Sequence, residues 1–443
     1  MSLVKTIRNI WAIEDLRKRL IMTFLLVLVY RFGCFVVLPG IDPNALLSFT
    51  QNADKGLMGL LNMFSGGAFS QASILALGIM PYITASIVIQ LLGMVLPSFQ
   101  KMQREGESGR QKLNQYTRYL TVLILLMQAP AYLYNLQAQT GGAIELGIGN
   151  VIYLTIILAA GSMFIMWLGE RITDRGIGNG ISFIILIGII ARFLPSLTAE
   201  FISRIPGADS QGGGLIMFVV EVILLLAVTI GAVLLVQGTR KVPVQYAKRI
   251  VGNKQYGGAR QYIPLKVNAA GVMPIIFAQA IMFIPMTFAG FNQDGTGFLA
   301  TFSDMNGFWY NFVFFLMIVA FTYFYTAITV RPTQMAEDMK RNNGFIPGVK
   351  PGKKTAEYLD SIMSRITLPG SIFLGIVAIL PAFARMLNIS QDFAQFFGGT
   401  SLLIMVGVVL DTLQQIESHL MMHHYDGLMK DGKIKGRTTG SAY

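Results

Sequence analysis

Stretches of about 20 mostly apolar residues recur from one end of the chain to the other, and this is the length that a helix needs to cross a bilayer. Backbone groups that face lipid have no water to bond, so each stretch is expected to be an α-helix. We therefore predict an all-α membrane protein with ten transmembrane helices, over residues 20–38, 73–96, 117–136, 151–169, 181–198, 214–237, 268–290, 308–330, 367–388 and 397–416.

The composition excludes a soluble protein. Apolar residues make up 53% of the 443 residues and charged residues only 13%, about half the share that is usual in a soluble domain. The single cysteine, Cys34, excludes an intramolecular disulfide and a cysteine metal cluster. No small-residue cleavage site follows the first apolar stretch, so we expect that stretch to be a retained membrane anchor.

Lysine and arginine residues are distributed unevenly between the two sides of the predicted membrane. With Arg118 and Arg385 counted in the loops that adjoin their spans, 30 of the 35 fall in the N-terminal segment 1–19, the even-numbered loops and the C-terminal tail 417–443. Three fall in the odd-numbered loops, and the other two lie within spans. By the positive-inside rule, both termini are cytoplasmic, which agrees with an even number of spans.

Two of the cytoplasmic loops are unusually long. Residues 238–267 and 331–366 each contain seven basic residues. Orientation alone explains the charge but not the length, because long loops in compact proteins are usually functional. Their charge suits acidic lipid, the RNA of a ribosome or an acidic protein partner.

The ten spans divide into two halves of five, residues 20–198 and 199–416. The second span of each half is interrupted by helix-breaking residues. Gly66-Gly67 precede span 2 and Pro81 lies within it, while span 7 contains Gly271, Pro274 and Pro285. Interrupted helices at matching positions suggest an inverted repeat with a transport pathway at its interface.

The motifs of common enzymes and pumps are not matched. His419 and His423 have the spacing of a metalloprotease pair, but Leu420 stands where that motif needs glutamate. GVKPGKKT and GIGNG do not match a P-loop or a dinucleotide-binding loop. We expect no catalytic site, no metal and no cofactor.

Charged residues within the spans are few. They are Arg31, Arg192, Glu221 and Asp411, and Arg31 and Glu221 lie deepest. Each of these two would cost about 2.5–3.5 kcal/mol at a helix centre if it were unpaired. We expect pairing or water contact for both, but the sequence does not assign their partners.

Six longer segments resemble the SecY family, the central subunits of the bacterial protein-conducting channel. They occur in family order along the whole chain, and they read NMFSGGAFSQASILALGIMPYITASIVIQLL, EGESGRQKLNQYTRYLT, MWLGERITDRGIGNGISFII, YIPLKVNAAGVMPIIFA, GFIPGVKPGKKTAEYLDSIMSRIT and FFGGTSLLIMVGVVLD. The resemblance implies a channel subunit, not an enzyme, that moves unfolded secretory chains across the plasma membrane and releases hydrophobic segments sideways into lipid.

In that family, the segment before span 2 is a short re-entrant plug helix. The resemblance places the plug at about residues 58–70, with Met63, Phe64, Ser65, Gly66 and Gly67 at its centre. The two glycines would give it freedom to move. The alternative is a re-entrant loop that only fills space.

The family also has an apolar pore ring and a lateral gate. The resemblance places the pore ring at Ile79, Ile83, Ile181, Ile185, Ile276 and Ile404. A ring of isoleucines excludes water by dewetting, and its side chains can part around a peptide. The lateral gate falls on Thr84, Ser86, Ile87, Gln90, Phe277, Gln279 and Ala280. Gln90 and Gln279 are expected to hydrogen-bond across the closed gate at roughly 1 kcal/mol.

The two long loops resemble the family's docking sites for the SecA motor and the ribosome. The basic residues concerned are Lys248, Arg249, Lys254, Arg260, Lys340, Arg341, Lys350, Lys353 and Lys354. Lys350 stands where the family usually has arginine; it keeps the charge but loses the planar bidentate fork. Further implied partners are small SecE-like and SecG-like membrane subunits, translocating polypeptides with their signal sequences, and acidic lipids.

Two other functions stay open. An inverted-repeat secondary transporter of a small solute would need convergent polar or charged ligands near the middle of the membrane, in place of bare isoleucine. A membrane scaffold without a conduit would explain neither the plug-like segment nor the paired interrupted helices.

Overall fold

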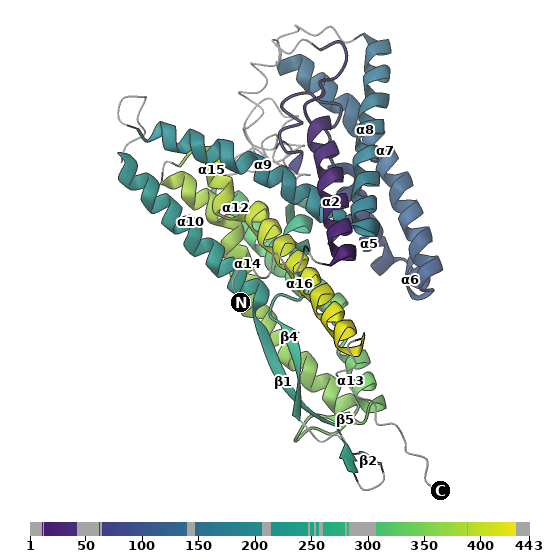
Figure 1. The fold of residues 1–443 in the computed structure, drawn as a ribbon. Coiled ribbons are helices and arrows are strands. Elements are labelled where there is room, and N and C mark those ends of the chain that lie inside the picture. The colour runs from purple at the N-terminus through teal and green to yellow at the C-terminus, as the bar shows by residue number, and fades with distance from the viewer. Residues whose placement is uncertain are drawn as a thin grey trace. The chain divides into compact units, whose positions relative to one another are not determined.

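The computed structural model describes residues 11, 13–41, 62, 64–139, 147–205, 214–246, 249–251, 254–256, 260–279, 281–282, 307–387 and 389–430 (Figure 1). These residues form two compact units. Unit 1 contains residues 1–192 and 408–443, and unit 2 contains residues 193–407.

Long helices dominate both units, as apolar stretches of this length predict. The helices are α2 (Glu14–Gly33), α5 (Met80–Val95), α6 (Pro97–Arg104), α7 (Glu107–Gln139), α8 (Ile148–Arg175), α9 (Gly180–Ser203), α10 (Gly214–Gln237), α12 (Phe308–Thr329), α13 (Pro332–Arg341), α14 (Lys353–Met386), α15 (Gln391–Ala394), the 3-10 helix η3 (Gln395–Phe397) and α16 (Gly399–Lys430). In unit 1, α7 packs against α5 and α8, and α2 packs against α8; in unit 2, α14 packs against α12 and α13.

The predicted all-α membrane fold is confirmed, but the number of spans is not reproduced in the described residues. Seven described helices are long and apolar enough to cross a membrane, or eight if the bent pair α5 and α6 is one span. The first turns of α2 are charged, which leaves it a short apolar part. Predicted span 7 is helical over residues 273–279, and its residues 280 and 283–290 lie outside the described residues.

The predicted start of span 2 at residue 73 is wrong. Residues 74–79 have turn conformation, and α5 begins only at Met80. Gly78 has a positive φ of 57°, which a helix does not contain, and Pro81 occupies the first turn, where its missing N–H is tolerated. The apolar residues before Met80 are therefore part of a folded turn region and do not lengthen the span.

The long loop 238–267 contains β-structure that the all-α prediction missed. Strand β1 (Thr239–Tyr246) pairs antiparallel with β4 (Arg260–Lys266), with Val242 opposite Ile263, and with the short β5 (Gly344–Phe345) from the second long loop. The short strands β2 (Arg249–Val251) and β3 (Lys254–Tyr256) form a separate ladder. The sequence did contain the alternating pattern of a β-strand, because apolar Val242 and Val244 alternate with polar or exposed neighbours in β1.

The two long loops fold together into what we call the basic lobe, residues 239–246, 260–266 and 332–366. Helix α14 starts 14 residues before predicted span 9, so its first part belongs to this lobe. One apolar cluster joins the hairpin to α13 and α14; its buried members are Val242, Val244, Leu265, Met339, Ile346, Leu359 and Met363. Figure 1 shows the β1–β4 hairpin extending beyond the end of α10.

This cluster gives a first prediction. Val244 is fully buried in it, so Val244→Asp places an unpaired carboxylate among apolar side chains. We expect the hairpin to detach from α13 and α14 and to become sensitive to limited proteolysis. Lys241→Asp, on the exposed face of the same strand, is the control and should leave the digestion pattern unchanged. Equal resistance of both variants would contradict the packing of the lobe.

Candidate functional site: a buried turn segment in unit 1

Residues 64–79 form an unusual feature of unit 1, because they are buried without being a regular helix. Twelve of these 16 residues are buried and none is exposed. The backbone is helical at Asn62 and Phe64 and then forms turns from Ser65 onward, interrupted by a bridge at Ser73. Gly66 and Gly67 both have positive φ, at 67° and 91°, which ends the helix there. The predicted helix over 58–70 is thus replaced by turns after Phe64, while residues 58–61 and 63 lie outside the described residues.

Side chains of α2 bind the first turn of this segment. The Tyr30 hydroxyl donates to the carbonyl oxygen of Ser65 at 3.2 Å, and Arg31 Nη1 donates to that of Gly66 at 3.0 Å. The Cys34 thiol lies 3.9 Å from the same Ser65 oxygen. Arg31 also lies over the ring of Phe35, at 5.4 Å from its centroid. The intramembrane charge of Arg31 is therefore satisfied by a backbone carbonyl and an aromatic ring.

Two glycines of neighbouring helices let the segment approach closely. A Cβ at Gly161 of α8 would lie 2.0 Å from the carbonyl oxygen of Ile74. A Cβ at Gly188 of α9 would lie 3.1 Å from the carbonyl oxygen of Phe64 and 3.2 Å from the amide nitrogen of Gly66. Both helices thus pack directly against the backbone of the segment, so a side chain at Gly161 has no room at all.

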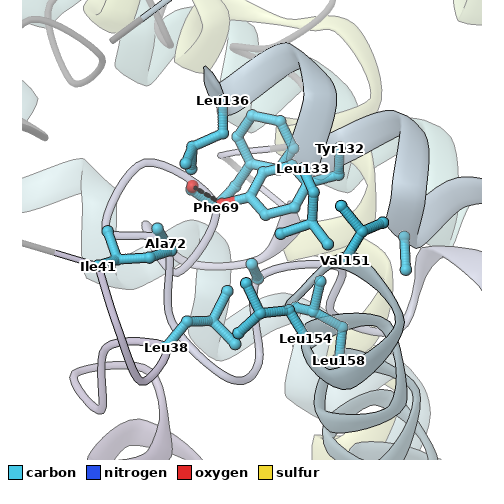
Figure 2. Close-up of a cluster of buried hydrophobic side chains, with 12 residues drawn as sticks. Leu38, Ile41, Phe69, Ala72, Tyr132, Leu133, Leu136, Val151, Leu154 and Leu158 are labelled. Carbon is cyan, nitrogen blue, oxygen red and sulfur yellow. Dashed lines mark hydrogen bonds between the residues drawn. The ribbon is translucent and has the colours of Figure 1, made fainter. Parts of the chain in front are cut away.

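An apolar cluster holds the second part of the segment. Phe69 packs against Tyr132 of α7 with ring centroids 4.8 Å apart, and the Tyr132 hydroxyl donates to the Phe69 carbonyl at 2.8 Å (Figure 2). Other buried members of this cluster are Leu38, Ile41, Ala72, Ala76, Ala129, Leu133, Leu136, Val151, Leu154 and Leu158. The backbone is also tied, because Leu38 N–H bonds the Ala72 carbonyl and Ile74 N–H bonds the Val36 carbonyl, both at 2.9 Å.

The segment therefore has a weakly held part and a firmly held part. Hydrogen bonds to Ser65 and Gly66 contribute on the order of 1–3 kcal/mol each. The part from Phe69 to Ala76 buries apolar side chains in a packed cluster and is paired to residues 36–38. We expect residues 64–68 to leave their site more easily than residues 69–76.

The predicted pore-ring residues are distributed over both units. Ile79, Ile83, Ile181 and Ile185 belong to unit 1, and Ile276 and Ile404 belong to unit 2. Ile79, Ile185 and Ile404 are buried within the structure, while Ile83, Ile181 and Ile276 are half-buried. Ring closure stays a prediction.

The predicted gate residues make contacts within their own units. In α5, the Gln90 amide lies 3.4 Å from Ser86 Oγ, and the Thr84 hydroxyl donates to the Met80 carbonyl at 3.1 Å; Ile87 is buried. In unit 2, Phe277 stacks on Phe321 of α12 at 5.8 Å, while Gln279 is half-buried. The hydrogen bond between Gln90 and Gln279 stays a prediction, and Ala280 and Met63 lie outside the described residues.

The predicted docking residues that the structure describes with side chains lie on the surface of the basic lobe. Lys340, Arg341, Lys350, Lys353 and Lys354 are all exposed, and Lys354 pairs with Glu357 at 3.3 Å. Gly348 and Gly352, both with positive φ, shape the turn that presents Lys350. Arg249, Lys254 and Arg260 are described by their backbone only, and Lys248 lies outside the described residues.

Within the described residues, no three His, Cys, Asp or Glu side chains gather where a metal ion would bind. The polar side chains of α2 in unit 1 form a backbone-binding site, with donors aimed at two successive carbonyls.

Comparison with known proteins agrees with this architecture. The SecY family profile matches residues 73–413. The chain is 40% identical over 440 residues to the protein translocase subunit SecY of Mycobacterium tuberculosis, which covers 94% of this chain and 97% of that protein. It is 39% identical over 455 residues to the protein translocase subunit SecY of Chlamydia muridarum, with 98% and 99% covered.

Solved structures with the same fold include a protein conducting channel, with a TM-score of 0.62 and 20% identity over 91% of this chain and 92% of that one. Another is a SecY structure described as one in which the plug domain stabilises the closed state of the translocation channel and maintains a membrane seal (TM-score 0.61, 18% identity, 91% and 92% covered). Sec61 in the canine ribosome–channel complex gives a TM-score of 0.59 at 18% identity, with 91% and 92% covered. The chain belongs to the SecY family of protein translocase subunits.

Proposed function

We propose that this chain is the channel subunit that conducts unfolded secretory polypeptides across the bacterial plasma membrane, and that residues 64–79 form its plug. The observation that carries the proposal is the buried, non-helical segment whose backbone is bound by Tyr30 and Arg31 and packed against Gly161 and Gly188. A segment that only filled space would not need buried donors aimed at its carbonyls.

The way the segment is held suits a plug that has to leave and return. The turn at Ser65–Gly66 depends on a few hydrogen bonds, whereas the cluster around Phe69 and Tyr132 fixes the following residues. We propose that residues 64–68 move away when a polypeptide enters and that residues 69–76 keep the segment attached. The two positive-φ glycines provide the backbone freedom for that movement.

The remaining site residues complete the proposed conduit. The isoleucine ring closes the pore around the chain, and spans 2 and 7 form the lateral gate through which hydrophobic segments pass into lipid. The basic lobe docks the SecA motor or the ribosome, and its exposed lysines and arginine support this. The inverted halves 20–198 and 199–416, cytoplasmic termini, SecE-like and SecG-like companions and acidic-lipid contacts belong to the same proposal.

The transporter alternative has less support. It needs convergent charged or polar ligands that are free to bind a solute. The deep residue Arg31 is instead bound to a backbone carbonyl, and Glu221 is buried against Arg204.

A double variant tests the plug. Tyr30→Phe combined with Arg31→Met removes the two donors to Ser65 and Gly66, a loss of at least about 2 kcal/mol that raises the fraction of channels with a displaced plug at least roughly 30-fold. We expect a matching rise in ion leak through vesicles that contain the channel complex without precursor, while precursor translocation continues. The measurement is the rate of ion efflux from such vesicles.

Phe32→Leu is the control, because Phe32 is exposed on the same helix. It should leave the leak unchanged. A double variant that translocates precursor but leaks no more than the Phe32 control would show that this turn does not seal the channel.

A further inference from the structure

Three charged side chains are completely buried at the end of α9 in unit 2. Arg204 Nε lies 3.0 Å from Glu200 Oε1, and Arg204 Nη2 lies 2.7 Å from Glu221 Oε1 of α10. The side chains of these three residues are 0%, 0% and 1% exposed. This cluster joins α9 to α10, and Ser390 N–H, just before α15, donates to Glu200 Oε2 at 3.2 Å.

The cluster carries one more negative charge than positive charge if both carboxyl groups are ionised, because arginine stays protonated in proteins. Arg204 is the only cation bound to either carboxylate in the described residues. Helix α10 contains no other charged residue, and no charged residue of the neighbouring α14 and α15, including Arg385 and Asp392, pairs with Glu221. A net charge buried in this way is strongly unfavourable.

The two carboxyl groups differ in how many donors they accept. Both oxygens of Glu200 are bound, one by Arg204 and the other by the Ser390 amide. Glu221 accepts only from Arg204, and its Oε2 is buried without a hydrogen-bond partner among the described residues. A buried carboxylate oxygen without a hydrogen-bond partner carries the largest desolvation cost in the cluster, and a proton on this oxygen removes that cost.

We propose that this cluster is a proton-binding site that holds one proton from solvent on Glu221 Oε2. Glu221 is then a neutral carboxylic acid whose Oε1 still accepts from Arg204, and Glu200 and Arg204 form the ion pair. The proton makes the cluster neutral, and it stabilises the joint between α9, α10 and the segment before α15. The proposal does not depend on the channel function.

The sign of the pH effect follows from the proton count. The unfolded chain has an ionised Glu221 at neutral pH, so folding takes up one proton and stability falls as pH rises. Over the pH range in which the folded protein holds this proton and the unfolded chain does not, this group alone changes the unfolding equilibrium constant by about tenfold per pH unit. Glutamine imitates the protonated acid, so Glu221→Gln is expected to remove this dependence and to keep or raise the melting temperature.

The matched control is Glu200→Gln, which removes the ionised partner instead. We expect Glu200→Gln to lower the melting temperature at every pH, while Glu221→Gln does not. Wild-type protein, with its glutamates isotope-labelled, should show the infrared band of a protonated glutamate carboxyl at neutral pH. That band should persist in Glu200→Gln and vanish in Glu221→Gln.

Three results would overturn the proposal. The first is a wild-type infrared spectrum without the band, a result that does not require any variant to fold. The second is a melting temperature that Glu221→Gln lowers more than Glu200→Gln does. The third is a wild-type melting temperature that changes with potassium concentration and does not change with pH. The last would mean that a monovalent cation, and not a proton, neutralises the cluster.

Discussion

Replacing Gly161 by valine should displace the 64–79 segment from unit 1 and produce the largest rise in ion leak of any single substitution in this part of the chain. The added Cβ would lie 2.0 Å from the Ile74 carbonyl oxygen, and this contact is with backbone, which cannot rotate away. The segment cannot shift locally either, because the Ile74 amide is bound to the Val36 carbonyl. Overpacking of this kind costs at least about 1–3 kcal/mol.

Gly149→Val is a close control, because Gly149 lies on the same helix and a Cβ there would meet nothing within 4 Å. The measurement is ion efflux from vesicles without precursor, together with protease cleavage at residues 64–79. If Gly161→Val behaves like Gly149→Val in both assays, the close approach of α8 to the segment is not present in the protein.

Removing the cation of the buried cluster should give the largest loss of stability. Arg204→Met leaves Glu200 and Glu221 buried with no cation bound to them, and breaking a buried ion pair in this way costs about 3–5 kcal/mol. Methionine keeps most of the side-chain volume, so the effect reports charge and not a cavity. We expect a large fall in the thermal unfolding temperature of the purified protein in lipid nanodiscs.

The bidentate pair Arg118–Glu170 provides the control. It has similar geometry, with Arg118 Nη2 at 2.8 Å from Glu170 Oε1, but its side chains are 47% and 31% exposed. Water solvates exposed charges, so Arg118→Met should lower the free energy of unfolding by only about 0–1 kcal/mol. Similar unfolding temperatures for the two methionine variants would contradict the burial of the Arg204 cluster.

The helices that hydropathy alone defines were predicted well. Predicted span 214–237 has the same bounds as α10, and predicted span 308–330 ends one residue after α12. In lipid, a helix is the only way to satisfy the backbone of such stretches, so local sequence determines them. The predicted start of span 2 was wrong because the residues from Ile74 to Ile79 are apolar for another reason: they pack inside unit 1.

Features that depend on contacts between distant residues could not be predicted from the sequence. The partner of Arg31 is a carbonyl 35 residues away, and Glu221 pairs with Arg204, which lies 17 residues before it in the chain. No local pattern marks a backbone carbonyl as a ligand, or Gly161 as the glycine that Ile74 approaches. The β1–β4 hairpin did carry a local signal, the alternation at Val242 and Val244, but it is short and lies in a charged loop.

The central claim is that a polypeptide passes through this chain, and site-specific crosslinking to a stalled secretory chain tests it most directly. Cys34 is replaced, and single cysteines are placed in turn at Ile83, Ile185, Ile276 and Ile404. Ile152 and Ile223, which are 58% and 61% exposed on α8 and α10, provide isoleucine controls on the outer faces of their units.

We predict that all four ring positions capture the stalled chain and that the two controls do not. Capture at Ile152 and Ile223 but at none of the ring positions would contradict the conduit. Accumulation of a small solute in vesicles by a protein that captures no chain would establish the transporter in its place.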